Sequence, residues 1–135
     1  MLTTRAHMDA AIKAQVLPHL RKLGFKGSLP HLHRLRGAAA DLVGLQFHSA
    51  GGAFVVEIGR VASAGFDFHG RHIPLAKANV TYLAHRHRLG APLTGGDHWF
   101  PFAERDPGEV AQEVIAALDG NGLWALIDSW PVLGQ

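Results

Sequence analysis

Histidine is the residue type whose number and spacing most readily suggest chemistry in this chain. The sequence holds ten histidines in 135 residues, and the pairs His31/His33 and His85/His87 are each separated by one residue. On a β-strand this spacing directs both imidazoles to one side, as a metal site requires. Zinc, copper or nickel would still need a third ligand brought in by the fold, for which the candidates are His48, His98 and Asp97.

The alternative interpretation is that these are surface histidines whose spacing arose by chance. We adopt this interpretation, so the sequence predicts no metal site and no cofactor. A histidine-metal protein, with a hydrolase as its enzymatic form, remains the second hypothesis for the function.

Other catalytic signatures are missing from the sequence. The chain has no cysteine, which excludes thiolate zinc sites and cysteine nucleophiles, and no glycine-rich loop has the spacing of a nucleotide-binding motif. Two carboxylates, Glu57 and Asp67, are expected on the central sheet, where an inward Glu more often pairs with an Arg than performs acid-base catalysis. No nucleophile-elbow context surrounds the serines, which are Ser28, Ser49, Ser63 and Ser129. We therefore predict no catalytic residues and favour a binding function over an enzyme.

Charge is distributed unevenly along the chain. The formal net charge is +2, but residues 1–96 hold twelve basic against four acidic side chains, whereas residues 97–135 hold one against seven. The two parts should attract each other, and we expect most of these charges to be solvated. Nucleic acid is a third and less favoured partner, because the basic residues are not clustered; its candidate contacts are Arg34, Arg36, Arg60, Arg86 and Arg88.

Length and composition indicate one folded domain over residues 1–135. An apolar content of 47% argues against disorder. The chain has no apolar signal-peptide core and no apolar run long enough to span a bilayer, so we expect no membrane association. Together with the lack of cysteine, this predicts a cytoplasmic protein.

Two long helices are predicted, one near each end. The first covers Thr4 to Leu23, with a break near Ala14 to Leu17 caused by Pro18 and a left-handed cap at Gly24. The second begins at Asp106, which has the N-cap position before Pro107 and Glu109, and ends in the turn over residues 119–122. A short helix over residues 123–130 should follow. The buried stripe of the second helix is Val110, Val114 and Leu118.

The middle of the chain predicts strands. The candidates are residues 31–36, 41–48 and 53–61, the last two joined as a hairpin through Gly51 and Gly52. The faces of these strands that point away from the core should be partly exposed to solvent. Residues 62–77 are predicted to be a long connecting loop with room for a short strand, and a lid or contact loop is the alternative. Residues 78–89 fit strand or helix equally, and residues 97–102 indicate a short strand. The core side chains expected on one face are Val43, Leu45, Phe47, Phe54, Val56 and Ile58.

The order of these parts resembles the bacterial family catalogued as domain of unknown function 4304. The matching positions are Leu23-Gly24-Phe25-Lys26, Arg88-Leu89-Gly90, Asp97 with Trp99, and Gly122-Leu123. The chain departs from the family near Ala84, where a polar or cysteine residue is common, and at residues 31–35, where aromatic residues are common. The resemblance implies an α+β domain with an antiparallel sheet and flanking helices, and it supplies no catalytic residues.

A protein-binding module is the function that the sequence favours, with a regulatory or immunity-like role. The expected binding surface is formed by Arg86, Arg88, Asp97 and Trp99. Trp99, Trp124 and Trp130 have a second interpretation as core residues whose indole N–H groups donate to carbonyl oxygens.

Overall fold

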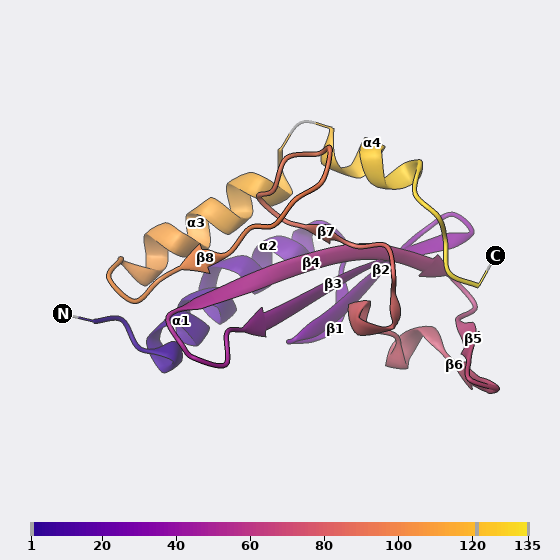
Figure 1. The fold of residues 1–135 in the computed structure, drawn as a ribbon, viewed down its shortest axis with the longest axis horizontal. Coiled ribbons are helices and arrows are strands. Elements are labelled where there is room, and N and C mark those ends of the chain that lie inside the picture. The colour runs from indigo at the N-terminus through magenta and orange to yellow at the C-terminus, as the bar shows by residue number, and fades with distance from the viewer. Residues whose placement is uncertain (1, 121, 135) are drawn as a thin grey trace.

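The fold is an antiparallel sheet covered by helices on one face, as a computed structural model of residues 2–120 and 122–134 shows (Figure 1). The strands of the main sheet lie in the order β1 (Lys26–Ser28), β2 (His31–Arg36), β3 (Ala39–Phe47), β4 (Ala53–Ala62) and β7 (His87–Arg88), and β8 (Phe100–Pro101) also pairs with β4. The two ends of the chain lie at opposite ends of the molecule (Figure 1). This is the α+β architecture with terminal helices that the sequence predicted.

The first helix is interrupted, as Pro18 predicts. It consists of α1 (Arg5–Ala11), a π-helical turn (Ile12–Val16) and α2 (Leu17–Lys22). Pro18 has no N–H, and the preceding N–H of Leu17 donates to the Ile12 carbonyl five residues back, so the irregular turn absorbs the missing bond. Gly24 ends α2 at φ +98°, and the Phe25 N–H donates to the Leu20 carbonyl at 3.0 Å, which is the predicted Schellman cap.

The main strands lie within two residues of their predicted bounds. They are β2 (His31–Arg36), β3 (Ala39–Phe47) and β4 (Ala53–Ala62), and the β3–β4 hairpin is confirmed with Phe47 opposite Phe54. Three shorter strands complete the sheet: β1 (Lys26–Ser28), β7 (His87–Arg88) and β8 (Phe100–Pro101). The last two fall within segments for which the sequence indicated a short or ambiguous element.

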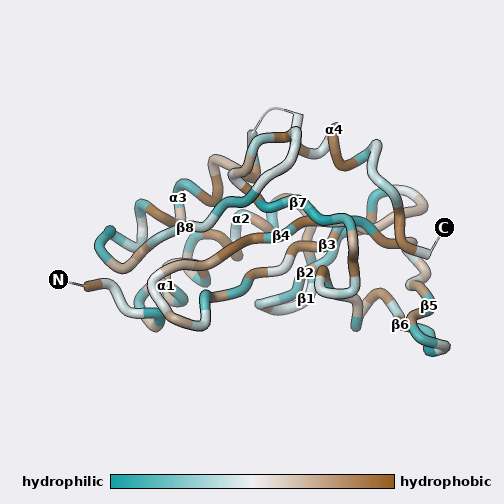
Figure 2. The backbone as a smooth tube through the Cα atoms, viewed as in Figure 1, coloured by the Kyte–Doolittle hydropathy of each residue, from teal (hydrophilic) through white to brown (hydrophobic). Residues whose placement is uncertain are grey.

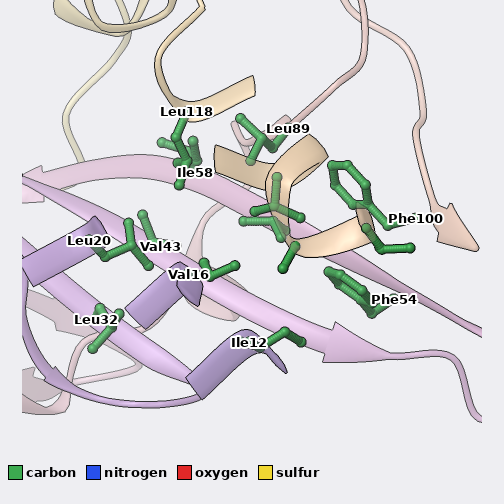
Figure 3. Packing of buried hydrophobic residues seen from close by; sticks show 14 of the residues in the cluster. Ile12, Val16, Leu20, Leu32, Val43, Phe54, Ile58, Leu89, Phe100 and Leu118 are labelled. Atoms are coloured by element: carbon green, nitrogen blue, oxygen red, sulfur yellow. The ribbon is translucent and has the colours of Figure 1, made fainter. Parts of the chain in front are cut away.

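The main core lies between the sheet and the helices, and Figure 3 shows its side chains from the π-helical turn, α2, β2, β3, β4 and α3 (Pro107–Leu118) converging. The predicted residues Val43, Phe54, Val56 and Ile58 are buried there. Leu45 and Phe47 pack against this core from the predicted face but are only half-buried, at the end of β3 that lies beyond the first residue of β2.

One half of the opposite face of the sheet is less exposed to solvent than predicted. A second apolar cluster covers it there, formed by Ala40, Leu42, Val61, Phe66, Ile73, Ala78, Val80 and Leu83. The segment predicted as a loop supplies this cover, with the hairpin β5 (Phe66–Phe68) and β6 (Arg71–Ile73) and the 3₁₀ turns Leu75–Lys77 and Val80–Tyr82. It packs so closely that a Cβ at Gly44 would lie 2.5 Å from Cγ2 of Val80. The other half of this face, which carries Glu57, lies outside this cluster; Gln46 is exposed there, beside buried Val55, and we call it the open half.

The C-terminal helices are α3 (Pro107–Leu118) and α4 (Leu123–Asp128). Asp106 caps α3 as predicted, its side chain accepting from the Glu109 N–H at 3.0 Å. In the predicted turn between the two helices, Asn121 lies outside the described residues. None of the helices within residues 2–120 and 122–134 combines the length and the apolar character that a membrane span needs.

Candidate functional site

The open half of the sheet carries the four residues that the sequence singled out. Strand register places Arg88 of β7 directly opposite Glu57 of β4, and Glu57 is almost completely buried, with 8% of its side chain exposed. Its Oε2 atom lies 3.3 Å from Nε of Arg88 and 3.4 Å from Nε of Arg86. One buried carboxylate therefore holds both guanidinium groups at the surface.

Asp97 and Trp99 approach Arg88 from the segment that leads into β8. Nη1 of Arg88 donates to Oδ1 of Asp97 at 2.8 Å, and the Trp99 indole N–H donates to Oδ2 of the same carboxylate at 3.3 Å. The Arg88 guanidinium lies 5.2 Å from the centre of the Trp99 ring, within cation–π range. The ring of His48 packs against Trp99 with the centroids 4.9 Å apart.

These contacts define the Arg88 cluster, which consists of Glu57, Arg86, Arg88, Asp97 and Trp99. The structure brings Arg88, Asp97 and Trp99 into direct contact and joins Arg86 to them through Glu57. Figure 2 shows hydrophilic residues along β7, beside the apolar β4. The role of Glu57 at the centre of the cluster and the contact with His48 were missed from the sequence, because only the register of β4 against β7 and β8 places them there.

A second buried carboxylate, Asp41, lies on the helix-covered face. Its side chain is fully buried and accepts from Nε and Nη2 of Arg34 at 3.0 and 2.8 Å and from Nε and Nη2 of Arg36 at 2.5 and 3.0 Å. Nε of Arg60 lies 3.9 Å away. Arg34 also stacks on Trp124, at 4.4 Å from the ring centre. This second group ties β2, β3 and β4 to α4.

The family described as "Domain of unknown function (DUF4304)" matches residues 16–128. The chain belongs to this family. The matched range begins in the π-helical turn and ends at the last residue of α4, so it includes both the Arg88 cluster and the Asp41 network. No curated protein and no solved structure matches this DUF4304 chain.

The five arginines considered for nucleic-acid binding already have partners in the DUF4304 fold. Asp41 lies within ion-pair distance of Arg34, Arg36 and Arg60, and Glu57 of the remaining two, Arg86 and Arg88. Binding to phosphates depends on cations that can neutralise them. The positive charge of each of these arginines is thus offset in part by a buried carboxylate of the fold.

The two histidine pairs lie on opposite faces of the sheet. His31 is in register with Gly44 on the face that carries Glu57, and its buried Nδ1 has no hydrogen-bond partner among the described residues. His87 is in register with the core residue Ile58, and the rings of His85 and His87 lie 4.4 and 5.9 Å from that of Trp130. Burial lowers the pKa of both His31 and His87.

The remaining candidate metal ligands are engaged by neighbouring aromatic rings or arginine. His48 packs on Trp99, His98 packs on Phe100 with the centroids 4.8 Å apart, and Asp97 binds Arg88. Across residues 2–120 and 122–134, no three His, Asp or Glu side chains are placed to hold one metal ion.

The other residues named from the sequence have structural contacts. Glu57 pairs with arginines, as predicted, whereas Asp67 lies on the separate β5–β6 hairpin rather than the central sheet, beside His72. The Trp124 indole N–H donates to the Leu118 carbonyl at 3.1 Å, as expected for a core tryptophan. The Trp99 indole differs, since its partner is the exposed carboxylate of Asp97.

Proposed function

We propose that this DUF4304 domain is a protein-interaction module of the bacterial cytoplasm, and that the Arg88 cluster contacts its partner. The observation that carries the proposal is an arginine and a tryptophan held against each other on an open sheet face by buried Glu57 and exposed Asp97. Arginine and tryptophan are enriched among the residues that dominate protein–protein binding energies.

The supports around these two side chains favour binding. Trp99 is fixed by a hydrogen bond to Asp97, by Arg88 above its ring and by the edge contact of His48. Because a side chain that is already ordered loses little conformational entropy on association, such a surface binds with a smaller entropic cost. Arg88 and Trp99 are half-buried, so both keep a face that a partner can cover.

The charges of the cluster favour a protein surface over a polyanion. Arg86 and Arg88 are balanced by Glu57 and Asp97, so the cluster has no excess positive charge. A partner is therefore recognised through planar donors, the indole face and the Asp97 carboxylate. A regulatory or immunity-like role is the biological context that we propose for this binding, and the absence of cysteine is compatible with a reducing compartment.

Site-specific photo-crosslinking in the native host tests the proposal. A photoreactive phenylalanine analogue is placed at Pro101, an exposed residue of β8 in register with Ala53 on the face that carries Glu57. The control places the analogue at exposed Lys22 on α2. We expect Pro101 to capture one protein that Lys22 does not capture, and equal capture from both positions would contradict the proposal.

The affinity of the purified pair then tests the individual residues. Trp99→Ala and Arg88→Lys should each weaken binding by about thirtyfold, the equivalent of roughly 2 kcal/mol. Arg88→Lys keeps the charge but loses the planar guanidinium. Lys22→Ala is the control and should leave the affinity unchanged. An unchanged affinity in both cluster variants would show that the partner binds elsewhere.

A further inference from the structure

A pocket of about 460 Å³ lies at the end of the sheet, away from the Arg88 cluster. Its lining includes Leu29 and Pro30 before β2, Leu45 and Phe47 at the end of β3, and Ile12 in the π-helical turn. Ligand sites in proteins have volumes of roughly 300 to 1,000 Å³ and combine apolar walls with a few polar groups. The size and the apolar walls of this pocket fit that description.

The backbone of β3 presents an open edge to this pocket. The Leu45 N–H donates to the Pro30 carbonyl at 3.0 Å, but Pro30 has no N–H with which to pair with the Leu45 carbonyl in return. One step further along, the His48 N–H donates to the Ala53 carbonyl of β4 at 2.8 Å. Because hydrogen-bonding groups alternate in direction along an antiparallel strand, the N–H and C=O of Phe47 point away from β4, to the side where β2 has already ended.

The open edge of β3 has room for two residues of an added strand. A strand that continues the line of β2 backwards would place one residue opposite Phe47 and the next opposite Gln46. Pro30 occupies the following place, opposite Leu45. An added strand that runs antiparallel to β3 therefore has its C-terminal end beside Pro30, whereas a parallel strand has its N-terminal end there.

Charge at the pocket selects between these two chain ends. Arg5 lies over the Phe47 ring at 4.4 Å and forms no ion pair with any residue in the ranges 2–120 and 122–134. Lys13 also lines the pocket and pairs with Asp9 at 2.8 Å. Two cations and one carboxylate leave a net positive charge, which attracts a carboxylate and repels an ammonium group.

We propose that this pocket binds the C-terminal end of an extended polypeptide. The penultimate residue of the ligand forms two backbone hydrogen bonds with Phe47, and its side chain lies on the same face as Phe47, towards α1. The last residue lies opposite Gln46, and its carboxylate lies against Arg5 and Lys13. The ligand is therefore a chain terminus, and the site is separate from the Arg88 cluster.

Titration of the ¹⁵N-labelled domain with acetyl-Thr-Thr-Leu-Thr tests this proposal by NMR. The peptide with a free carboxylate should shift the amide of Phe47, and its C-terminal carboxamide should bind at least about tenfold more weakly, because it lacks the charge-assisted interaction. N-methylation of the leucine removes the donor to the Phe47 carbonyl and should weaken binding by about tenfold. N-methylation of the final threonine is the matched control, since that N–H points away from β3.

Protein variants locate the carboxylate. Arg5→Gln should weaken the free-acid peptide at least about fivefold and leave the carboxamide unchanged, whereas Lys22→Gln should alter neither. Equal affinity for acid and carboxamide, equal effects of the two N-methyl peptides, or no shift at Phe47 at millimolar peptide would each overturn the proposal. Shifts confined to Trp99 would overturn it too, although they would leave the proposed function of the Arg88 cluster standing.

Discussion

Removing the charge of Asp41 tests whether the buried ion-pair network holds the fold together. Asp41→Asn keeps the shape of the side chain but leaves the guanidinium group of Arg34 without a counter-charge and that of Arg36 with Asp128 alone. Losing one partner of a buried ion pair costs about 3 to 5 kcal/mol, because the remaining charge stays buried and uncompensated. Asp41 is fully buried, while Arg34 and Arg36 keep 14% and 27% of their side chains exposed. Since water reaches the arginines in part, we expect the lower end of the range, about 3 kcal/mol.

Urea unfolding at pH 7, followed by tryptophan fluorescence and circular dichroism, measures this loss. For a chain of this size, about 3 kcal/mol also corresponds to a fall of roughly 10 °C in the melting temperature. Asp67→Asn is the control: Asp67 pairs with His72 but keeps 83% of its side chain exposed, so its loss should change stability by less than about 0.5 kcal/mol. A loss below about 1 kcal/mol in Asp41→Asn would refute the inference that this network fixes α4 to the sheet.

Further predictions concern single elements of the fold. Asp106→Ala removes the acceptor for the Glu109 N–H and should lower stability by about 1 kcal/mol in urea unfolding; an unchanged midpoint would contradict the cap. Phe47→Ala should cost about 2 kcal/mol, below the range of a fully buried phenylalanine, because Phe47 is half-buried. Burial lowers the pKa of His87 below its ordinary value of 6.5, so the unfolded chain binds the proton more tightly and stability should fall as the pH drops through 6.5. His87→Gln should make the urea midpoint less dependent on pH between about pH 7 and 5, and an equally steep profile would argue against this origin. Dialysis of untagged protein against a chelator should leave the melting temperature unchanged, whereas stoichiometric zinc, copper or nickel that disappears in His85→Ala/His87→Ala would restore the metal-site hypothesis.

Local sequence patterns predicted the helices and the main hairpin because their determinants lie within a few residues. The Asp106 cap, the Gly24 terminator and the interruption by Pro18 each follow from backbone chemistry that is complete inside one turn. The alternation along β3 and β4 likewise predicted which side chains face the helices. The degree of burial at Leu45 and Phe47 did not follow from this alternation, since both residues lie beyond the first residue of β2.

The segment from Phe66 to Leu83 could not be predicted in this way. Its strands are three residues long, and its 3₁₀ turns are equally short, so no apolar period can develop. Its position depends on glycines elsewhere in the chain: a Cβ at Gly44 or Gly59 would collide with Val80 or Leu83. The packing of this segment on one half of the sheet face thus depends on the small residues Gly44 of β3 and Gly59 of β4 as much as on the segment itself.

The same limit applies to the Arg88 cluster. The sequence named its exposed members, but the carboxylate that organises them, Glu57, lies about thirty residues earlier and meets Arg88 only through a two-residue strand. A buried Glu in an apolar strand was a recognisable signal for an arginine partner, although it did not say which arginine. The register of β4 against β7 decides which arginine lies opposite Glu57, and this register depends on residues far apart in the sequence.

Part of the charge asymmetry along the chain is met by contacts within the fold. The basic part meets the acidic part through Arg36 with Asp128 at 2.6 Å and Arg88 with Asp97 at 2.8 Å, and Nε2 of His19 lies at hydrogen-bond distance from Asp119, at 2.7 Å. Each pair joins the sheet or α2 to the segment that follows residue 96, so the attraction expected between the two parts acts within the fold. Arg5, over the open edge of β3, is not used in this way. A cation left outside the internal pairing is better placed to meet a charge from another molecule, which is why the carboxylate dependence of binding at that edge is the sharpest measurement to make.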